Sequence, residues 1–253
     1  MNTSLKHIFM CVLIVGAWPA AAASAKQDDC ASEVLGARYS IAMTQSKNGK
    51  QETSEHEFNL WRKGDLVVHE DGRKKIAELW HKLPNGFISM TRYFDTHQRA
   101  INYHSVDLNN GRGEKNWLVK YQIVSDALLQ SMTLKESHGE GCLNVEHYLL
   151  SASSPDQASL SIEWYPHLRL VHAYMLTNDT QSLSWTLNEI VHDPAIVMAQ
   201  FDKWQAYDDT DYADVGDNES DPFLQKMINM GFIEHGASGV YDAGGHGLGG
   251  HAH

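Results

Sequence analysis

Apolar residues recur at every second position in a series of short segments along this chain. The pattern is clearest between positions 56 and 106, where, for example, Ile76 and Trp80 lie two positions on either side of the polar Glu78. Turn-forming pairs such as Asp71-Gly72 separate the segments. A period of two indicates strands whose two faces differ, and short turns between such strands favour antiparallel neighbours. The sequence therefore predicts an antiparallel meander in this region.

Similar segments extend the predicted sheet in both directions. Asn48-Gly49 follows the first segment and is the strongest short hairpin signal in the chain. Ser125-Asp126 has the composition of a helix N-cap and predicts a short helix over ALLQSM. The segments expected to form strands are 37–46, 56–62, 65–70, 74–83, 86–94, 99–106, 117–124, 142–150, 159–165, 168–176 and 184–191. The predicted fold class is thus mainly β, a curved antiparallel sheet or half-barrel of roughly ten strands.

The pattern changes after the last predicted strand. Asp193 followed by proline caps an amphipathic helix expected over 194–207. An acidic linker is expected over 208–221, and a short helix capped by Asp221 over 222–231. The remaining residues, 232–253, are rich in glycine and histidine and predict a flexible tail without core-forming pattern.

The first residues have the pattern of a secretory signal. Lys6 precedes an apolar run from Ile8 to Gly16, which is too short for a bilayer span of about 20 residues. Small residues then lead to an expected cleavage site after Ala25. The chain is therefore predicted to be periplasmic or secreted, without stable membrane insertion after cleavage. The expected organisation is a signal peptide (1–25), a β-rich domain ending in an amphipathic helix (26–207), the acidic linker (208–221), the short helix (222–231) and the tail (232–253).

Two cysteines, Cys30 and Cys142, remain once the signal is removed. An exported chain with two cysteines favours one structural disulfide. Free thiols, or a thiol pair used in redox or copper chemistry, are the alternatives. The absence of a C-x-x-C motif favours the disulfide.

The net charge of -12 changes the expected partners. It disfavours nucleic acid and anionic membrane surfaces, because few positive groups would neutralise phosphates. It suits a protein that attracts cations.

The acidic run 208–221 is not an EF-hand, since Pro222 stands where the loop needs glycine. A solvated linker is the favoured interpretation of the run, with another kind of cation site as the alternative.

The candidate chemistry lies in the tail. Four of the 15 histidines, His235, His246, His251 and His253, are separated mainly by glycine. Neutral imidazole is a common ligand of Zn, Cu and Ni, and glycine lets a short chain bring distant imidazoles together. The sequence therefore predicts a transition-metal site at these four residues. A solvated glycine-rich tail without a metal is the alternative.

The overall pattern resembles the exported half-barrel proteins that carry lipoproteins or lipids across the periplasm, the LolA/LolB type. The resemblance covers about 37–207 and implies a curved sheet with helices against its concave face. No diagnostic motif accompanies it, so no functional residue is transferred. The tryptophans Trp61, Trp80, Trp164 and Trp185 fit core packing better than a ligand cage, but in a half-barrel carrier they would line an apolar cleft.

Three functional hypotheses follow, and none of them is an enzyme. No G-x-S-x-G or Walker motif occurs, and no G-x-G-x-x-G motif follows a predicted strand, although catalysis by residues scattered along the chain stays open. The first hypothesis is an exported binding protein whose tail buffers or delivers a metal ion. The second is a carrier of lipid, lipoprotein or another apolar ligand in the concavity of the sheet. The third is an accessory subunit of an envelope complex that docks a protein partner.

Overall fold

The computed structural model describes Cys30 and residues 33–47, 50–109, 112–151, 158–218 and 220–232. The predicted signal peptide, 1–25, lies outside the described residues. So do positions 233–253, which hold most of the predicted tail and all four of its candidate metal ligands.

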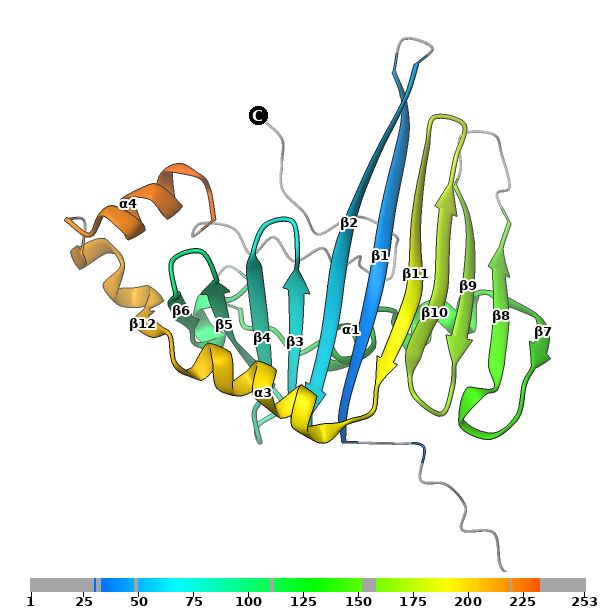
Figure 1. Ribbon diagram of the computed structural model, residues 1–253, viewed down its shortest axis with the longest axis horizontal. Helices are drawn as coiled ribbons and strands as arrows, with labels where there is room; N and C mark the ends of the chain where they lie inside the picture. Colours follow the sequence, from blue (N-terminus) through cyan, green and yellow to red (C-terminus); the bar gives the residue numbers. More distant parts are fainter. Residues whose placement is uncertain are drawn as a thin grey trace, which may run out of the picture.

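Among the described residues, twelve strands form one curved sheet, which confirms the predicted fold class (Figure 1). The strands are β1 (Val34–Lys47), β2 (Lys50–Lys63), β3 (Leu66–Asp71), β4 (Ile76–Lys82), β5 (Ile88–Phe94), β6 (Arg99–Tyr103), β7 (Thr133–His138), β8 (Val145–Leu150), β9 (Ser159–Tyr165), β10 (Leu170–Thr177), β11 (Gln181–Val191) and β12 (Asp208–Asp211). Their order in the sheet is β12-β6-β5-β4-β3-β2-β1-β11-β10-β9-β8-β7. Neighbouring strands are antiparallel except that β12 runs parallel to β6.

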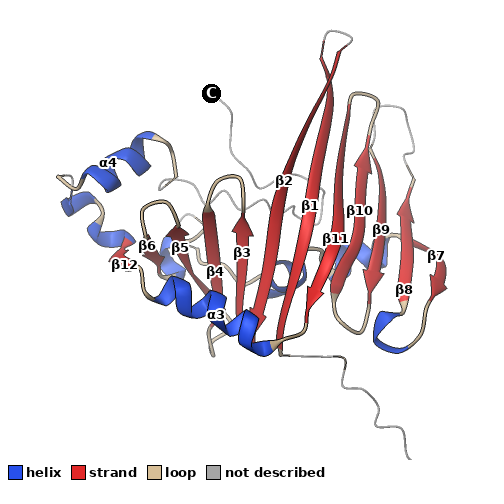
Figure 2. Cartoon of the chain, viewed as in Figure 1, coloured by secondary structure: helices blue, strands red, loops and turns tan. Residues whose placement is uncertain are grey.

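In the described part of the chain, four α-helices and several 3-10 turns accompany the sheet, and Figure 2 shows where the helices lie. The helices are α1 (Trp117–Gln122), α2 (Asp126–Ser131), α3 (Pro194–Gln205) and α4 (Pro222–Asn229). The predicted caps are present: Asp193 and Asp221 accept hydrogen bonds from the amides of Ala195 and Phe223 at 2.9 and 2.8 Å. Within the described residues, no helix combines the length and the apolar character needed to cross a membrane.

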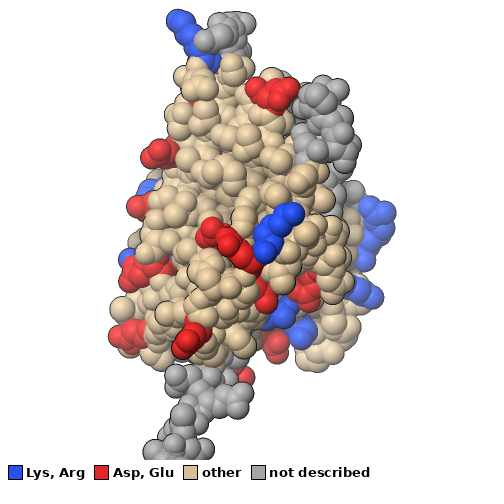
Figure 3. All heavy atoms as spheres, turned by 90° about the vertical axis from the view of Figure 1, so that its right-hand side faces the viewer, with Lys and Arg blue, Asp and Glu red and all other residues tan. Residues whose placement is uncertain are grey.

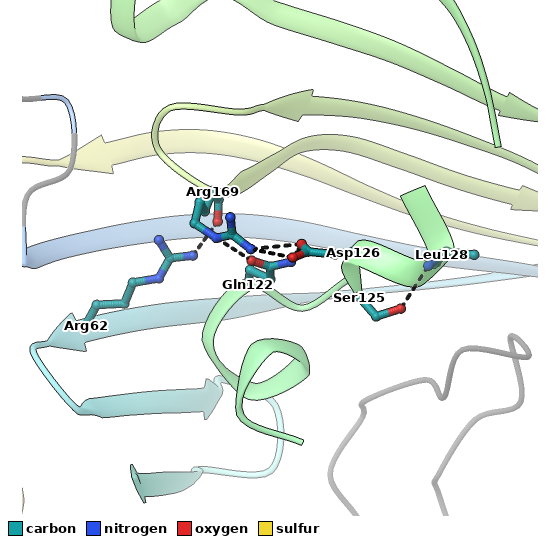
Figure 4. Close-up of polar contacts among 6 residues, drawn as sticks. All are labelled: Arg62, Gln122, Ser125, Asp126, Leu128 and Arg169. Carbon is teal, nitrogen blue, oxygen red and sulfur yellow. Dashed lines mark hydrogen bonds and ion pairs between the residues drawn. The ribbon is translucent and has the colours of Figure 1, made fainter. Parts of the chain in front are cut away.

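The sheet bends toward one face, which we call the concave face. Arg62 on β2 donates hydrogen bonds to the carbonyl oxygens of Leu168 and Arg169, beside β10, at 2.8 and 2.6 Å (Figure 4). Two strands lie between β2 and β10, so a flat sheet would separate them by about 14 Å. Tyr39 on β1 likewise donates to the carbonyl oxygen of Val171 on β10 at 2.9 Å. The side chains can make these contacts only because the sheet is strongly curved.

Each face of the sheet has its own apolar core. The larger core lies on the concave face, where it includes Leu60 and Ile101 of the sheet and Leu129 of α2. The smaller core lies on the opposite face, where α3 packs through Phe201 and Trp204. Strand residues alternate between the two cores, as the period of two predicts. The concave face thus receives the short helices α1, α2 and α4, and the opposite face receives α3.

Two expected elements differ from the structure. The segment 117–124, expected as a strand, begins with the helix α1. Its carbonyl groups explain the difference: those of Lys120 and Tyr121 accept hydrogen bonds from His69 and Arg62, so the sheet holds this segment as a helix across its concave face. Short apolar runs do not distinguish a strand from a buried helix.

The acidic segment is not only a linker, because its first four residues form β12. Asp209 accepts a hydrogen bond from Asn102 of β6, and the buried Val215 belongs to the concave core.

β7 was also not expected; all six of its residues are exposed, so it lacks the alternating pattern that indicates a strand.

Candidate functional site

A pocket of about 230 Å³ lies on the concave face and is the candidate functional site. It is formed mainly by the middle parts of β1 and β2 and by the neighbouring ends of β3, β4 and β11. Its lining residues are Ile41, Met43, Ser54, His56, Phe58, His69, Asp71, Arg73, Lys74, Ile76, Glu78, Arg92, Leu183, Trp185, Gly231 and Phe232.

Strand alternation and register bring these side chains together. His56 and Phe58 are two positions apart on β2, as are Leu183 and Trp185 on β11. Ile41 pairs with His56 on one side and with Trp185 on the other. Directly opposed residues point to the same face of a sheet, so these positions form one continuous surface.

Aromatic rings make the floor of the pocket. The ring centroids of Phe58 and Trp185 are 4.9 Å apart, and Tyr39 packs beside Trp185 at 6.0 Å. Phe58 also contacts the imidazole of His69 at 5.5 Å. Such rings offer a large, rigid apolar surface, which is suited to an apolar ligand.

His69 is a neutral, buried member of the floor. Its Nε2 lies 2.6 Å from the carbonyl oxygen of Lys120 in α1, which makes that nitrogen the donor. Burial lowers the pKa of His69 to about 3, and the hydrogen bond to Lys120 opposes this shift only in part. His69 therefore ties α1 to the sheet without bringing a charge into the pocket at neutral pH.

A buried ion pair closes one side of the pocket. Arg92 on β5 donates to Oε1 of Glu78 on β4 through Nε and Nη2, at 3.0 and 2.7 Å. Both side chains are almost fully buried. Arg92 also donates to the carbonyl oxygen of Phe232, whose residue lines the pocket with Gly231. The segment that follows α4 is thus fixed at the pocket wall by a charge-assisted hydrogen bond.

A second cavity, of about 360 Å³, lies on the opposite face and has a polar lining. Its carboxylate Glu70 already accepts hydrogen bonds from Asn59 and Trp61, at 2.9 and 3.0 Å. Paired polar groups of this kind stabilise the local structure and leave few donors for a ligand. The concave pocket is therefore the better candidate.

Isolated apolar residues are exposed at the end of the sheet formed by β7 and β8. Leu134 and Leu143 are 50% and 56% exposed. Figure 3 views this end of the molecule and shows acidic and basic side chains interspersed over it. Single exposed leucines are normal on protein surfaces and do not define a site.

The predicted disulfide between Cys30 and Cys142 is present, with a Cα–Cα distance of 5.2 Å. It joins the N-terminal segment to the turn before β8. The other predicted site residues, His235, His246, His251 and His253, lie outside the described residues, so the metal site remains a prediction. Among residues that the structure does describe, no three His, Cys, Asp or Glu side chains gather in a way that could hold a metal ion.

Sequence reasoning did not identify the polar residues of the pocket. His56, His69 and Arg73 come from separate segments, and only the sheet register brings them together. One residue in the sequence could have pointed to the pocket. Glu78 is a carboxylate between two buried apolar positions, Ile76 and Trp80, on a predicted strand. A charge at such a position requires a buried partner, which is Arg92.

No protein-family model matches the sequence, and the comparison with curated proteins found no match. Solved structures to which this chain is similar include PNGF-II, the MucA/MucB complex of Pseudomonas aeruginosa and a LolA superfamily protein of Nitrosomonas europaea. Their sequence identities to this chain are 11%, 11% and 6%, and the TM-scores are 0.32, 0.29 and 0.28.

The matched regions cover 69%, 62% and 66% of this chain in the same order. This chain spans only 31% of the PNGF-II chain and 51% of the MucA/MucB match, but 90% of the LolA superfamily protein.

Proposed function

We propose that this chain binds an apolar or amphipathic ligand, of the kind that a lipid or an acyl chain provides, in the pocket of the concave face. The observation that carries the proposal is an aromatic-floored cavity of about 230 Å³ on a face whose other parts are filled by α1, α2 and α4. A carrier of such a ligand is the function that this geometry supports best.

The energetics favour an apolar ligand. Each methylene group that moves from water into the pocket contributes about 0.8 kcal/mol. Phe58 and Trp185 already pack against each other and against the sheet, so little side-chain ordering opposes binding. A pre-formed apolar site of this size therefore suits a short hydrocarbon chain.

The disulfide supports an exported location for the carrier. A disulfide such as Cys30–Cys142 persists in oxidising compartments, whereas disulfides are rare in compartments where thiols are kept reduced. The predicted signal peptide agrees with this inference, and we propose the periplasm as the compartment.

An uncharged fluorescent probe tests the proposal. N-phenyl-1-naphthylamine added to the full chain should gain fluorescence on entering the pocket. The variant Ser54→Trp places an indole in the pocket wall opposite Met43 and should abolish most of this gain. The matched variant Glu55→Trp places the same group one position along β2, on the other face, and should leave binding unchanged.

Equal fluorescence gain in the two tryptophan variants would contradict the proposal, as would the absence of any gain in the unmodified chain. The hypotheses of a metal-binding tail and of docking to an envelope protein stay predictions from the sequence, and no contact in the described part of the chain favours either of them.

A further inference from the structure

The turn between β3 and β4 places two cationic side chains at the edge of the concave pocket. Oδ1 of Asp71 accepts hydrogen bonds from the backbone amides of Arg73 and Lys74, each at 2.9 Å, which fixes the turn. Gly72 lets the turn lie against β2, because an added Cβ there would come within 3.1 Å of the carbonyl oxygen of Glu57. The side chains of Arg73 and Lys74 both line the pocket as a result.

The turn has an excess of positive charge. Lys74 Nζ lies 3.7 Å from Oδ2 of Asp71, whereas Arg73 makes no ion pair with any residue that the structure describes. The surrounding chain is acidic, with a net charge of -12. Salt screens distant charges beyond about 8 Å, so the local cations determine what binds at contact distance.

His56 provides a third polar group beside these cations. Its Nδ1 is buried and has no hydrogen-bond partner among the described residues. Burial lowers the pKa of His56, nearby Arg73 and Lys74 lower it further, and Asp71 opposes them. The imidazole is therefore neutral at pH 7 and can donate one hydrogen bond. A buried polar atom without a partner marks a position where a ligand atom would complete the structure.

We propose that the ligand is a single-chain amphiphile with an anionic head group. Its hydrocarbon chain would lie on the floor of Phe58 and Trp185, and its head would contact Arg73, Lys74 and His56. This inference rests on the proposed function and adds the charge of the ligand to it. A volume of about 230 Å³ corresponds to roughly eight water-sized groups, so a medium-length chain fills the pocket.

Four eight-carbon probes that differ only in the head group test the inference by calorimetric titration of the full chain at pH 7. Octanoate and octyl phosphate are anionic, octanol is neutral, and octylammonium is cationic. The two anionic probes should bind about tenfold more tightly than octanol, because their heads form charge-assisted hydrogen bonds. Octylammonium should bind most weakly. Whichever anionic probe binds more tightly shows whether the site prefers a carboxylate or a phosphate head group.

A double variant assigns the preference to the turn. Arg73→Gln with Lys74→Gln should lower the affinity for octanoate about tenfold, to the level of octanol, and leave octanol binding unchanged. The control pair Arg112→Gln with Lys135→Gln removes the same two charges from exposed positions away from the pocket. It should leave the preference for octanoate intact.

Octanol binding as tightly as octanoate would overturn the inference, and so would a preference for octanoate that survives in the Arg73 and Lys74 variant. A preference that is lost equally in the control pair would also overturn it, because net charge alone would then explain it. In each of these cases neutral chains still bind, so the proposed function stands. Failure of all four probes to bind would overturn both.

Discussion

The guanidinium of Arg62 on β2 lies 2.6 Å from the carbonyl oxygen of Arg169 in the turn between β9 and β10. The turn residue Arg169 has a left-handed backbone, with φ of 51°, and its own side chain donates to Asp126 at 2.8 Å. Figure 4 shows how these contacts join β2, the β9–β10 turn and the segment of α1 and α2. The contact fixes the curvature of the sheet, and so the shape of the concave face.

Replacement of Arg62 should therefore destabilise the whole fold. Arg62→Met keeps much of the apolar length of the side chain but leaves three carbonyl groups, one buried and two partly buried, without this donor. We expect a loss of about 3 kcal/mol in the free energy of unfolding, measured by urea denaturation. The control Arg38→Met removes an exposed ion pair with Glu189 and should cost less than about 1 kcal/mol. Similar losses in the two variants would show that Arg62 does not hold the curvature.

His69 should make stability depend on pH on the acid side. Its pKa falls from 6.5 in the unfolded chain to about 3 in the fold, so the unfolded chain binds a proton first as pH decreases. Its stabilising effect is complete above pH 6.5 and is lost progressively from pH 6.5 down to about 3. Between pH 7 and pH 5 the loss should be about 2 kcal/mol.

His69→Gln retains a donor for the carbonyl group of Lys120 and does not titrate. Urea denaturation of this variant should show a smaller decrease in stability between pH 7 and pH 5 than the unmodified chain shows. Equal decreases would mean that His69 is already protonated, or accessible to water, in the fold.

The disulfide should contribute strongly to stability because it closes a long loop. Cys30 and Cys142 are separated by 112 positions, for which the chain-entropy relation gives about 4–5 kcal/mol. The double variant Cys30→Ser with Cys142→Ser should lower the free energy of unfolding by that amount. A reducing agent should have the same effect on the unmodified chain and none on the variant. A midpoint of unfolding that does not respond to reduction would contradict this role.

The fold class could be predicted from the strands that have one buried face and one more exposed face. β9 shows this pattern fully, with Leu160, Ile162 and Trp164 buried between partly exposed neighbours. The helices α3 and α4 could be predicted because aspartate and proline mark where they begin. β7 could not be predicted, since none of its residues is buried.

The pocket could be predicted only in outline. The tryptophan content indicated an apolar cleft, and Trp185 does line the pocket, but Trp61 lies in the core on the opposite face. Whether a given aromatic residue faces the concave side depends on the strand register and on bulges such as the one between Arg38 and Tyr39. Neither is visible in the composition of a single strand.

The tail carries a metal-binding prediction that the described residues leave open. Substitution of His235, His246, His251 and His253 by alanine in the full chain should abolish tight binding of Zn²⁺, Cu²⁺ or Ni²⁺, measured by calorimetric titration, because these imidazoles are the expected ligands. The pocket affinity for octanol should not change in this variant. Metal affinity that survives the four substitutions would remove the metal-binding hypothesis.

A methyl NMR titration tests the central claim, that the concave pocket binds an apolar chain, most directly. Octanol added to the full chain, labelled at its isoleucine, leucine and valine methyl groups, should shift the resonances of Ile41, Ile76 and Leu183, which line the pocket. The methyl groups of Val197, which belongs to α3 and is buried in the core on the opposite face, should not shift. Unmoved pocket resonances at saturating octanol, or shifts confined to Val197, would contradict the account.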